Sequence, residues 1–140
     1  MTPFYAQDHD YSSYNVLAVD DIPLNLLLVQ KMLAKFNFQL RTAANGHQAL
    51  DAVAAQKPDL ILLDLMMPGI DGFEVIRRLR ADAATADIQI VILSALNSNE
   101  DVVKGFNLGA NDFIMKPIIM EKLLSCMNTQ MQLVASKRAK

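Results

Sequence analysis

The 140-residue sequence predicts a single α/β domain, a doubly wound three-layer (βα)5 sandwich around a five-stranded parallel sheet. From Asn15 onward, short apolar runs alternate with longer amphipathic stretches, which is typical of repeated βα units. The apolar runs contain no alternation of polar and apolar residues, as expected of strands that helices cover on both faces. Because crossovers are right-handed and connections short, a doubly wound sheet is the simplest arrangement.

The apolar runs define the expected strands. They are rich in branched side chains and cover four to six residues each: Val16–Val19, Gln39–Ala43, Leu60–Leu63, Ile88–Leu93 and Asp112–Met115. Residues 1–14 are polar and lack a pattern, so we expect a flexible N-terminal tail in front of a domain that spans residues 15–140.

The amphipathic stretches define the expected helices: Pro23–Phe36, Gly46–Gln56, Phe73–Ala81, Asn99–Leu108 and a last helix over about 119–138. Their ends carry suitable residues. Pro23 fits a first helical turn, and Gly109 follows the fourth helix where a left-handed cap is needed. Asn97 with Glu100 three residues later resembles a capping box.

The last helix carries an apolar stripe. Its members recur at four- and three-residue intervals: Met120, Leu124, Met127, Met131 and Val134. Either the stripe packs inward throughout, or the end of the helix extends beyond the sheet and contacts another chain. The basic helix end at residues 137–140 suits the negative end of a helix dipole.

Composition excludes several classes of function. Thirteen Lys and Arg against fifteen Asp and Glu give a net charge of −2, so there is no broad basic surface for nucleic acid. Cys126 is the only cysteine, which excludes an internal disulfide and fits a reducing compartment. No stretch has the length of a membrane span or the pattern of a signal peptide, so we expect a cytoplasmic protein without a membrane partner.

Polar residues follow the ends of the predicted strands: Asp20, Asp21, Asp64, Ser94 and Lys116. Each alone is most simply a helix cap or a turn residue. Ligands of open parallel sheets, however, bind beyond the carboxyl ends of the strands. Three carboxylates at that edge need a cation, and oxygen ligands without His or Cys favour Mg²⁺, with Mn²⁺ as the alternative ion.

The same edge has the groups needed for phosphoryl transfer. Lys116 would supply a compact positive charge and Ser94 a hydroxyl donor, which together with a metal ion stabilise phosphoryl oxygens. Asp64 is the candidate nucleophile, because it ends the most apolar strand. Its attack on phosphorus would give an acyl phosphate.

Four motifs in order make a family resemblance. They are the acidic pair at 20–21, the stretch Asp64 to Gly72, Ser94 thirty residues after Asp64, and Phe113 to Pro117 with Lys116 twenty-two residues after Ser94. From about Asn15 to Leu133, the chain resembles the receiver domain of bacterial two-component response regulators, the CheY-like superfamily. The resemblance implies a flavodoxin-like fold with strand order 2-1-3-4-5.

The resemblance also implies roles for the acidic residues. Asp64 would be the phosphoacceptor. Asp21 would bind Mg²⁺ directly and Asp20 through water, while Asp64 and the main-chain carbonyl of Met66 would complete the protein ligands.

Four further roles follow from the same likeness. Lys116 would pair with the phosphoryl group, and Ser94 would move to bond one of its oxygens. Phe113 would rotate inward with that movement, so Ser94 and Phe113 would form the switch. Pro117 occupies the position of the family's cis-proline, whose isomer aims the preceding lysine.

The expected partners are a histidine kinase or histidine phosphotransfer protein, which would dock on the exposed face of the 23–36 helix, and a downstream effector protein. A homodimer could form through the last helices or through the face of the fourth helix, fifth strand and fifth helix. No output domain follows the receiver within the sequence, so it is either a stand-alone protein or a piece of a longer one such as a hybrid kinase.

Two other classes of function stay open. One is a receiver-like interaction module that ignores phosphorylation, against which the complete set of acidic, hydroxyl and lysine residues argues. The other is an aspartyl phosphohydrolase, which needs a polar group to orient water. Met66 and Leu96, two residues after Asp64 and Ser94, are apolar, so we expect slow autodephosphorylation and no turnover as an enzyme.

Overall fold

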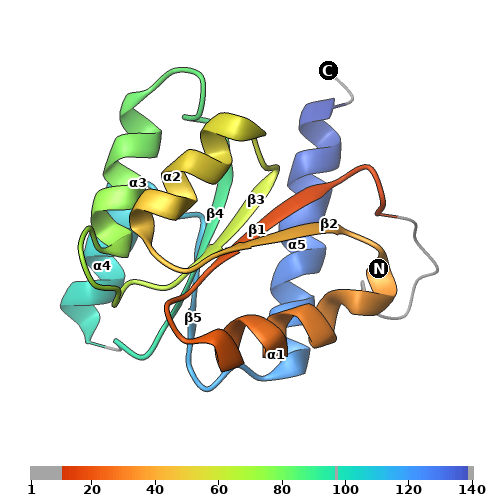
Figure 1. Cartoon of the computed structure of the whole chain (residues 1–140), viewed down its shortest axis with the longest axis horizontal. Helices are drawn as coiled ribbons and strands as arrows, with labels where there is room; N and C mark the ends of the chain where they lie inside the picture. Colours follow the sequence, from red (N-terminus) through yellow and green to blue (C-terminus); the bar gives the residue numbers. More distant parts are fainter. Residues whose placement is uncertain (1–10, 97, 139–140) are drawn as a thin grey trace.

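The computed structural model describes residues 11–96 and 98–138, and it confirms the predicted fold class (Figure 1). The elements in chain order are β1 (Asn15–Val19), α1 (Pro23–Leu33), the 3-10 turn η2 (Ala34–Phe36), β2 (Gln39–Ala43), α2 (Gly46–Ala55), β3 (Leu60–Leu63), α3 (Gly72–Ala81), β4 (Gln89–Ser94), α4 (Asn99–Leu108), β5 (Asp112–Met115) and α5 (Met120–Arg138). All strand pairs are parallel, in the order β2-β1-β3-β4-β5 that the resemblance implied.

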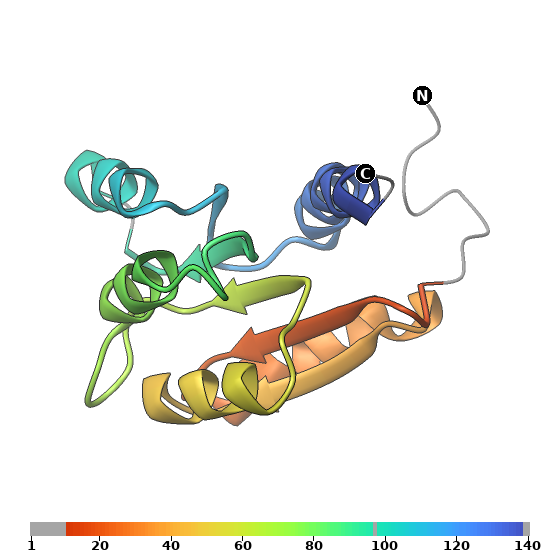
Figure 2. The ribbon, with the colours of Figure 1, turned by 90° about the horizontal axis from the view of Figure 1, so that it is seen from above.

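Helices cover both faces of the sheet, which explains the unbroken apolar strands. Figures 1 and 2 show α1 and α5 on one side and α2, α3 and α4 on the other. Val16 and Ala18 of β1 belong to the apolar cluster under α1 and α5, whereas Leu17 and Val19 belong to the cluster under α2 and α3. Successive side chains of a strand point to opposite faces, so both sets of side chains of a doubly covered strand are mostly apolar.

Element ends agree with the predictions or differ from them by one residue, except at the end of α1. The helix predicted to reach Phe36 stops at Leu33 and continues as the 3-10 turn. Asn37 ends this turn with a left-handed backbone (φ 63°), a conformation that Asn tolerates better than most residues.

The predicted cap of α4 is displaced by one residue. Asn97 lies outside the described residues, and the cap that the structure shows is Ser98. The Asp101 backbone N–H donates to Ser98 Oγ (3.1 Å), which in turn donates to an Asp101 carboxylate oxygen (2.7 Å). Gly109 closes the helix with φ 114°, as predicted.

The apolar stripe of α5 faces the sheet. Leu124, Met127, Met131 and Val134 are buried in the cluster shared with α1, and only Met120 at the start of the helix is exposed, at 42%. The first alternative, inward packing, therefore holds for all but the first position of the stripe. Within the described residues, no helix is both long and apolar enough to traverse a lipid bilayer.

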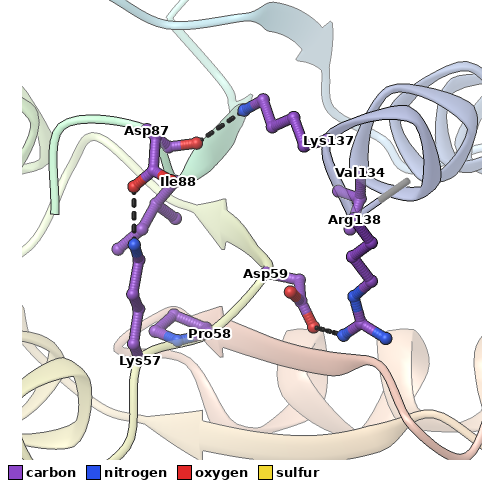
Figure 3. Close-up of a pocket in the computed structure, with 8 residues that line it drawn as sticks. All are labelled: Lys57, Pro58, Asp59, Asp87, Ile88, Val134, Lys137 and Arg138. Carbon is purple, nitrogen blue, oxygen red and sulfur yellow. Dashed lines mark hydrogen bonds and ion pairs between the residues drawn. The ribbon is translucent and has the colours of Figure 1, made fainter. Parts of the chain in front are cut away.

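The end of α5 is fastened to the amino-terminal edge of the sheet (Figure 3). The Lys137 ammonium donates to the Asp87 carbonyl oxygen (2.7 Å) and to the Gln89 side-chain oxygen (2.6 Å). The Arg138 guanidinium pairs with the Asp59 carboxylate at 2.8 Å. This helix end therefore lies against the sheet rather than extending away from it.

Part of the segment predicted as a flexible tail is docked. The Tyr11 ring stacks on Phe38 with 5.1 Å between centroids, and the Arg138 guanidinium carbon lies 3.9 Å from the centroid of the Tyr14 ring. The Gln39 backbone N–H donates to the Tyr14 carbonyl (3.0 Å). Residues 11–14 thus pack on the domain, while residues 1–10 lie outside the described part of the chain.

Candidate functional site

Backbone hydrogen bonds beyond the strand ends place the predicted site residues side by side. The Asp64 N–H donates to the Val19 carbonyl (2.9 Å), so Asp64 lies next to Asp20, the residue after β1. In the same way the Lys116 N–H donates to the carbonyl of Ser94 (2.8 Å), the last residue of β4. Parallel strands thus deliver these four residues to one edge of the sheet, as the sequence predicted.

Gly72 permits the close turn that follows Asp64. A Cβ at this position would lie 2.5 Å from the Asp64 carbonyl oxygen and 2.8 Å from Leu65 Cα, so any larger residue would push α3 away from the strand end. Asp71 caps α3 by accepting the Glu74 N–H (2.9 Å). Together they fix the path of the loop between the nucleophile candidate and α3.

The three predicted carboxylates do converge. Asp20, Asp21 and Asp64 each offer an oxygen, and these oxygens all lie within 4.8 Å of one another. Asp64 and Asp20 are only 4% and 6% exposed, whereas Asp21 faces solvent. Burial raises the pKa of Asp64 above its ordinary value; the Lys116 charge opposes this rise and the Asp20 charge adds to it.

Lys116 reaches both buried carboxylates but is closer to one of them. Its Nζ lies 2.8 Å from Asp20 Oδ2 and 3.5 Å from Asp64 Oδ1. The lysine side chain is 16% exposed. The peptide bond between Lys116 and Pro117 is cis, the isomer that the resemblance implied.

The donor set fits a magnesium ion. The three candidate ligands all offer carboxylate oxygens, and hard divalent cations prefer oxygen ligands. Three carboxylates and one ammonium leave two uncompensated negative charges, which one divalent ion would neutralise. Met66 follows Asp64 closely and donates its N–H to Asp64 Oδ1 (3.4 Å), while the role of its carbonyl oxygen as a ligand stays a prediction.

The two predicted switch residues occupy different environments. Ser94 is fully buried, and its Oγ accepts the Leu96 N–H (3.1 Å). Phe113 is half-buried and packs against the apolar cluster under α2 and α3, close to Gly105 of α4. A hydroxyl can accept one hydrogen bond and still donate its proton, so the bond from Leu96 does not use the donor capacity of the Ser94 hydroxyl.

Two hydrogen-bond donors to Asp20 were not predicted from the sequence. The Ile22 backbone N–H donates to Asp20 Oδ1 (2.9 Å), and the Asn25 side-chain amide donates to Oδ2 (3.1 Å). The sequence did contain a signal for the Asn25 donor. Pro23 begins α1, which places Asn25 in the first turn of the helix, next to the end of β1.

A second hollow lies at the opposite, amino-terminal edge of the sheet (Figure 3). Its lining residues are Lys57, Pro58, Asp59, Asp87, Ile88, Val134, Lys137 and Arg138. Its basic groups are already engaged: Lys57 pairs with Asp87 (2.6 Å), Lys137 donates to the Asp87 carbonyl oxygen, and Arg138 pairs with Asp59. These contacts hold the end of α5 against the sheet.

Comparison with known proteins identifies the family. The profile of the response regulator receiver domain matches residues 16–128. The chain belongs to this family. It is therefore a receiver domain of two-component signalling, as the four motifs suggested.

Relatives of this receiver include proteins of very different lengths. PilH of Pseudomonas aeruginosa is 36% identical over 113 residues, which cover 81% of this chain and 93% of PilH. The response regulator PleD of Caulobacter vibrioides is 43% identical over 106 residues, 76% of this chain but 23% of PleD. The chain thus spans about a quarter of PleD, and 46% of the Synechocystis regulator RpaA.

Solved structures agree with this assignment. The chemotaxis protein CheY4 of Vibrio cholerae superposes with a TM-score of 0.78 at 30% identity, covering 83% of this chain and 97% of CheY4. A receiver domain protein of Methanospirillum hungatei gives a TM-score of 0.82 at 22% identity over 89% and 98% of the two chains. The receiver thus has the fold of its family throughout the matched region.

Proposed function

We propose that Asp64 accepts a phosphoryl group from a histidine kinase or a histidine phosphotransfer protein, and that Ser94 and Phe113 convert this event into a change of the partner-binding surface. The observation that supports the proposal most is the position of Lys116 between two buried carboxylates, with a third carboxylate at their side. A structural salt bridge would need only one of these acids.

In the proposed reaction, an Asp64 carboxylate oxygen attacks phosphorus while the bond from phosphorus to the donor's imidazole nitrogen breaks. The electron pair of that bond stays on the imidazole. The Lys116 ammonium and the Ser94 hydroxyl donate hydrogen bonds to phosphoryl oxygens. When bound by Asp20, Asp21, Asp64 and the Met66 carbonyl, Mg²⁺ or Mn²⁺ would neutralise charge on those oxygens.

The phosphorylated form should be long-lived. Met66 and Leu96 line the hollow beside Asp21, and Met66 is 56% exposed. Neither side chain can orient a water molecule for attack on an acyl phosphate. We therefore assign the domain a signalling role without enzymatic turnover, in the cytoplasmic location expected from the sequence.

The exposed face of α1 is the proposed dock for the phosphohistidine donor. Leu24, Leu27 and Leu28 are 70%, 46% and 39% exposed, although leucines at such spacing normally face a core. They lie on the helix that follows Asp20 and Asp21, so a helical donor seated there could present its imidazole to Asp64. The surface of α4, β5 and α5 is the proposed contact for an effector or for a second copy.

A labelling experiment tests the proposal. Wild-type protein incubated with acetyl phosphate and Mg²⁺ should gain the mass of one phosphoryl group, and chelation of Mg²⁺ should prevent the gain. Asp64→Asn should abolish labelling, whereas Asp51→Asn, which changes an exposed carboxylate on α2, should label normally. If Asp64→Asn also leaves partner binding unchanged under phosphorylating conditions, the domain is instead a phosphorylation-independent interaction module. Rapid loss of label without a partner would favour a phosphohydrolase.

A further inference from the structure

The Asp20 carboxylate is the most heavily hydrogen-bonded group of the site. Its Oδ1 accepts the Ile22 N–H (2.9 Å), and its Oδ2 accepts both the Asn25 amide (3.1 Å) and the Lys116 ammonium (2.8 Å). Since Asp20 is 6% exposed, water cannot readily replace a lost donor. Its orientation therefore depends on these three protein groups.

Lys116 cannot serve Asp20 and a phosphoryl group on Asp64 equally well. Its Nζ lies 2.8 Å from Asp20 but 3.5 Å from Asp64, so the ammonium must shift towards Asp64 to bond a phosphoryl oxygen there. That shift would weaken the charged contact to Asp20 Oδ2. A buried carboxylate that loses its main donor needs another to keep its geometry.

The Asn25 amide is in position to be this other donor. It sits in the first turn of α1, whose position is fixed by buried Val29 and Leu33 against the sheet. Its amide is neutral, so it orients Asp20 without competing with a cation for the carboxylate charge. The Ile22 N–H bonds Oδ1, the other oxygen of the Asp20 carboxylate. The bond from Asn25 to Oδ2 then fixes the rotation of the carboxylate.

We propose that Asn25 is a positioning residue, which holds Asp20 in its metal-binding orientation both before and after Lys116 moves to the phosphoryl group. This inference rests on the proposed function, because it assigns Asn25 a part in the same reaction. Asn25 acts through Asp20 and touches no reacting atom.

The test measures Mg²⁺ binding directly, by isothermal titration of the unphosphorylated full chain. Asn25→Ala should raise the Mg²⁺ dissociation constant about threefold to tenfold, which corresponds to the typical net contribution of one protein hydrogen bond. Asn25→Leu keeps the size and branching of the side chain and should give the same rise. Gln30→Ala removes an amide from the exposed side of the same helix and should leave the constant unchanged.

Labelling with acetyl phosphate gives a second readout. In both Asn25 variants, half-maximal labelling should need about threefold to tenfold more Mg²⁺, while the rate at saturating Mg²⁺ stays within about twofold of wild type. A merely structural role would lower the rate at every Mg²⁺ concentration.

Three results would overturn the inference. One is a wild-type dissociation constant in both Asn25 variants. Another is recovery of wild-type affinity by Asn25→Leu but not by Asn25→Ala, which would make the effect one of packing. The third is a wild type that binds no Mg²⁺. Failure of the proposed function looks different: the wild type would bind Mg²⁺ but acquire no label.

Discussion

Replacing Asp64 by asparagine should stabilise the unphosphorylated domain. Coulomb attraction between Asp64 and the Lys116 ammonium at 3.5 Å is about 4.7 kcal/mol at an effective dielectric constant of about 20. Repulsion from Asp20, whose oxygen lies within 4.8 Å, opposes this by at least about 3.5 kcal/mol on the same scale. Exposed Asp21 adds about 0.9 kcal/mol if water screens it fully.

Attraction and repulsion therefore nearly cancel, and the cost of burying the charge decides the sign. The Asp64 side chain is 6% exposed, and burial is the main cause of its raised pKa. The amide of asparagine keeps the shape without the charge, and Lys116 retains Asp20 as a partner. We expect Asp64→Asn to gain about 1–2 kcal/mol in the free energy of unfolding at pH 7 without Mg²⁺.

Urea denaturation across a pH series checks both the size and the sign. Because the pKa of Asp64 is raised in the folded state, folding binds protons, and wild-type stability is lost as the pH rises through the folded pKa. The advantage of Asp64→Asn should thus be full above that pKa and vanish below the unfolded value of about 3.9. Mg²⁺ should reduce the advantage, because it stabilises the wild type more.

The exposed Asp51→Asn variant serves as the control and should change stability by less than about 0.5 kcal/mol. An Asp64→Asn variant less stable than wild type at neutral pH without Mg²⁺ would refute the reasoning. An advantage that grows on acidification would refute it equally, because the charge of Asp64 would then be stabilising.

Two further predictions concern the frame of the site. Gly72→Ala should cost about 1–3 kcal/mol in urea denaturation, because its Cβ would lie 2.5 Å from the Asp64 carbonyl oxygen; unchanged stability would mean that the loop yields freely. Arg138→Gln should cost less than about 1 kcal/mol, because its pair with Asp59 is partly exposed, and the loss should shrink at high salt. Amide hydrogen exchange at Tyr14 should quicken in that variant, and unchanged exchange would show that Arg138 does not hold the segment.

The sequence predicts the sheet well because its signals are local. Doubly covered strands leave apolar runs that differ from everything around them, so each strand was placed to within one residue. The end of α1 was harder, because no Gly or Pro separates Leu33 from Phe36 and the change to a 3-10 turn follows from packing. Asn97 and Ser98 are both good caps with an acid three residues on, so pattern alone could not choose between them.

Prediction of the site from the sequence is also limited to what local signals and topology determine. Strand ends place Asp20, Asp64, Ser94 and Lys116 at one edge, and parallel topology makes that placement predictable. The choice of Lys116 between two carboxylates is not local, since a lysine side chain with four rotatable bonds can reach either one. The hydrogen bond from Asn25 of α1 to Asp20, which also receives Lys116, is likewise visible only in the folded chain.

Hydrogen-bond capacity also explains how the proposed switch could act without rebuilding the site. Ser94 Oγ accepts the Leu96 N–H, which uses a lone pair and leaves its proton free to rotate. A phosphoryl oxygen that takes this proton would pull on Ser94 and, through the retained bond, on the backbone at Leu96, two residues before the cap of α4. Gly105 of the same helix lies against Phe113, so a shift of α4 would alter the space available to that ring. A signal could thus pass from Asp64 to the surface of α4 through contacts that already exist. The only new contacts would be those of the phosphoryl group itself.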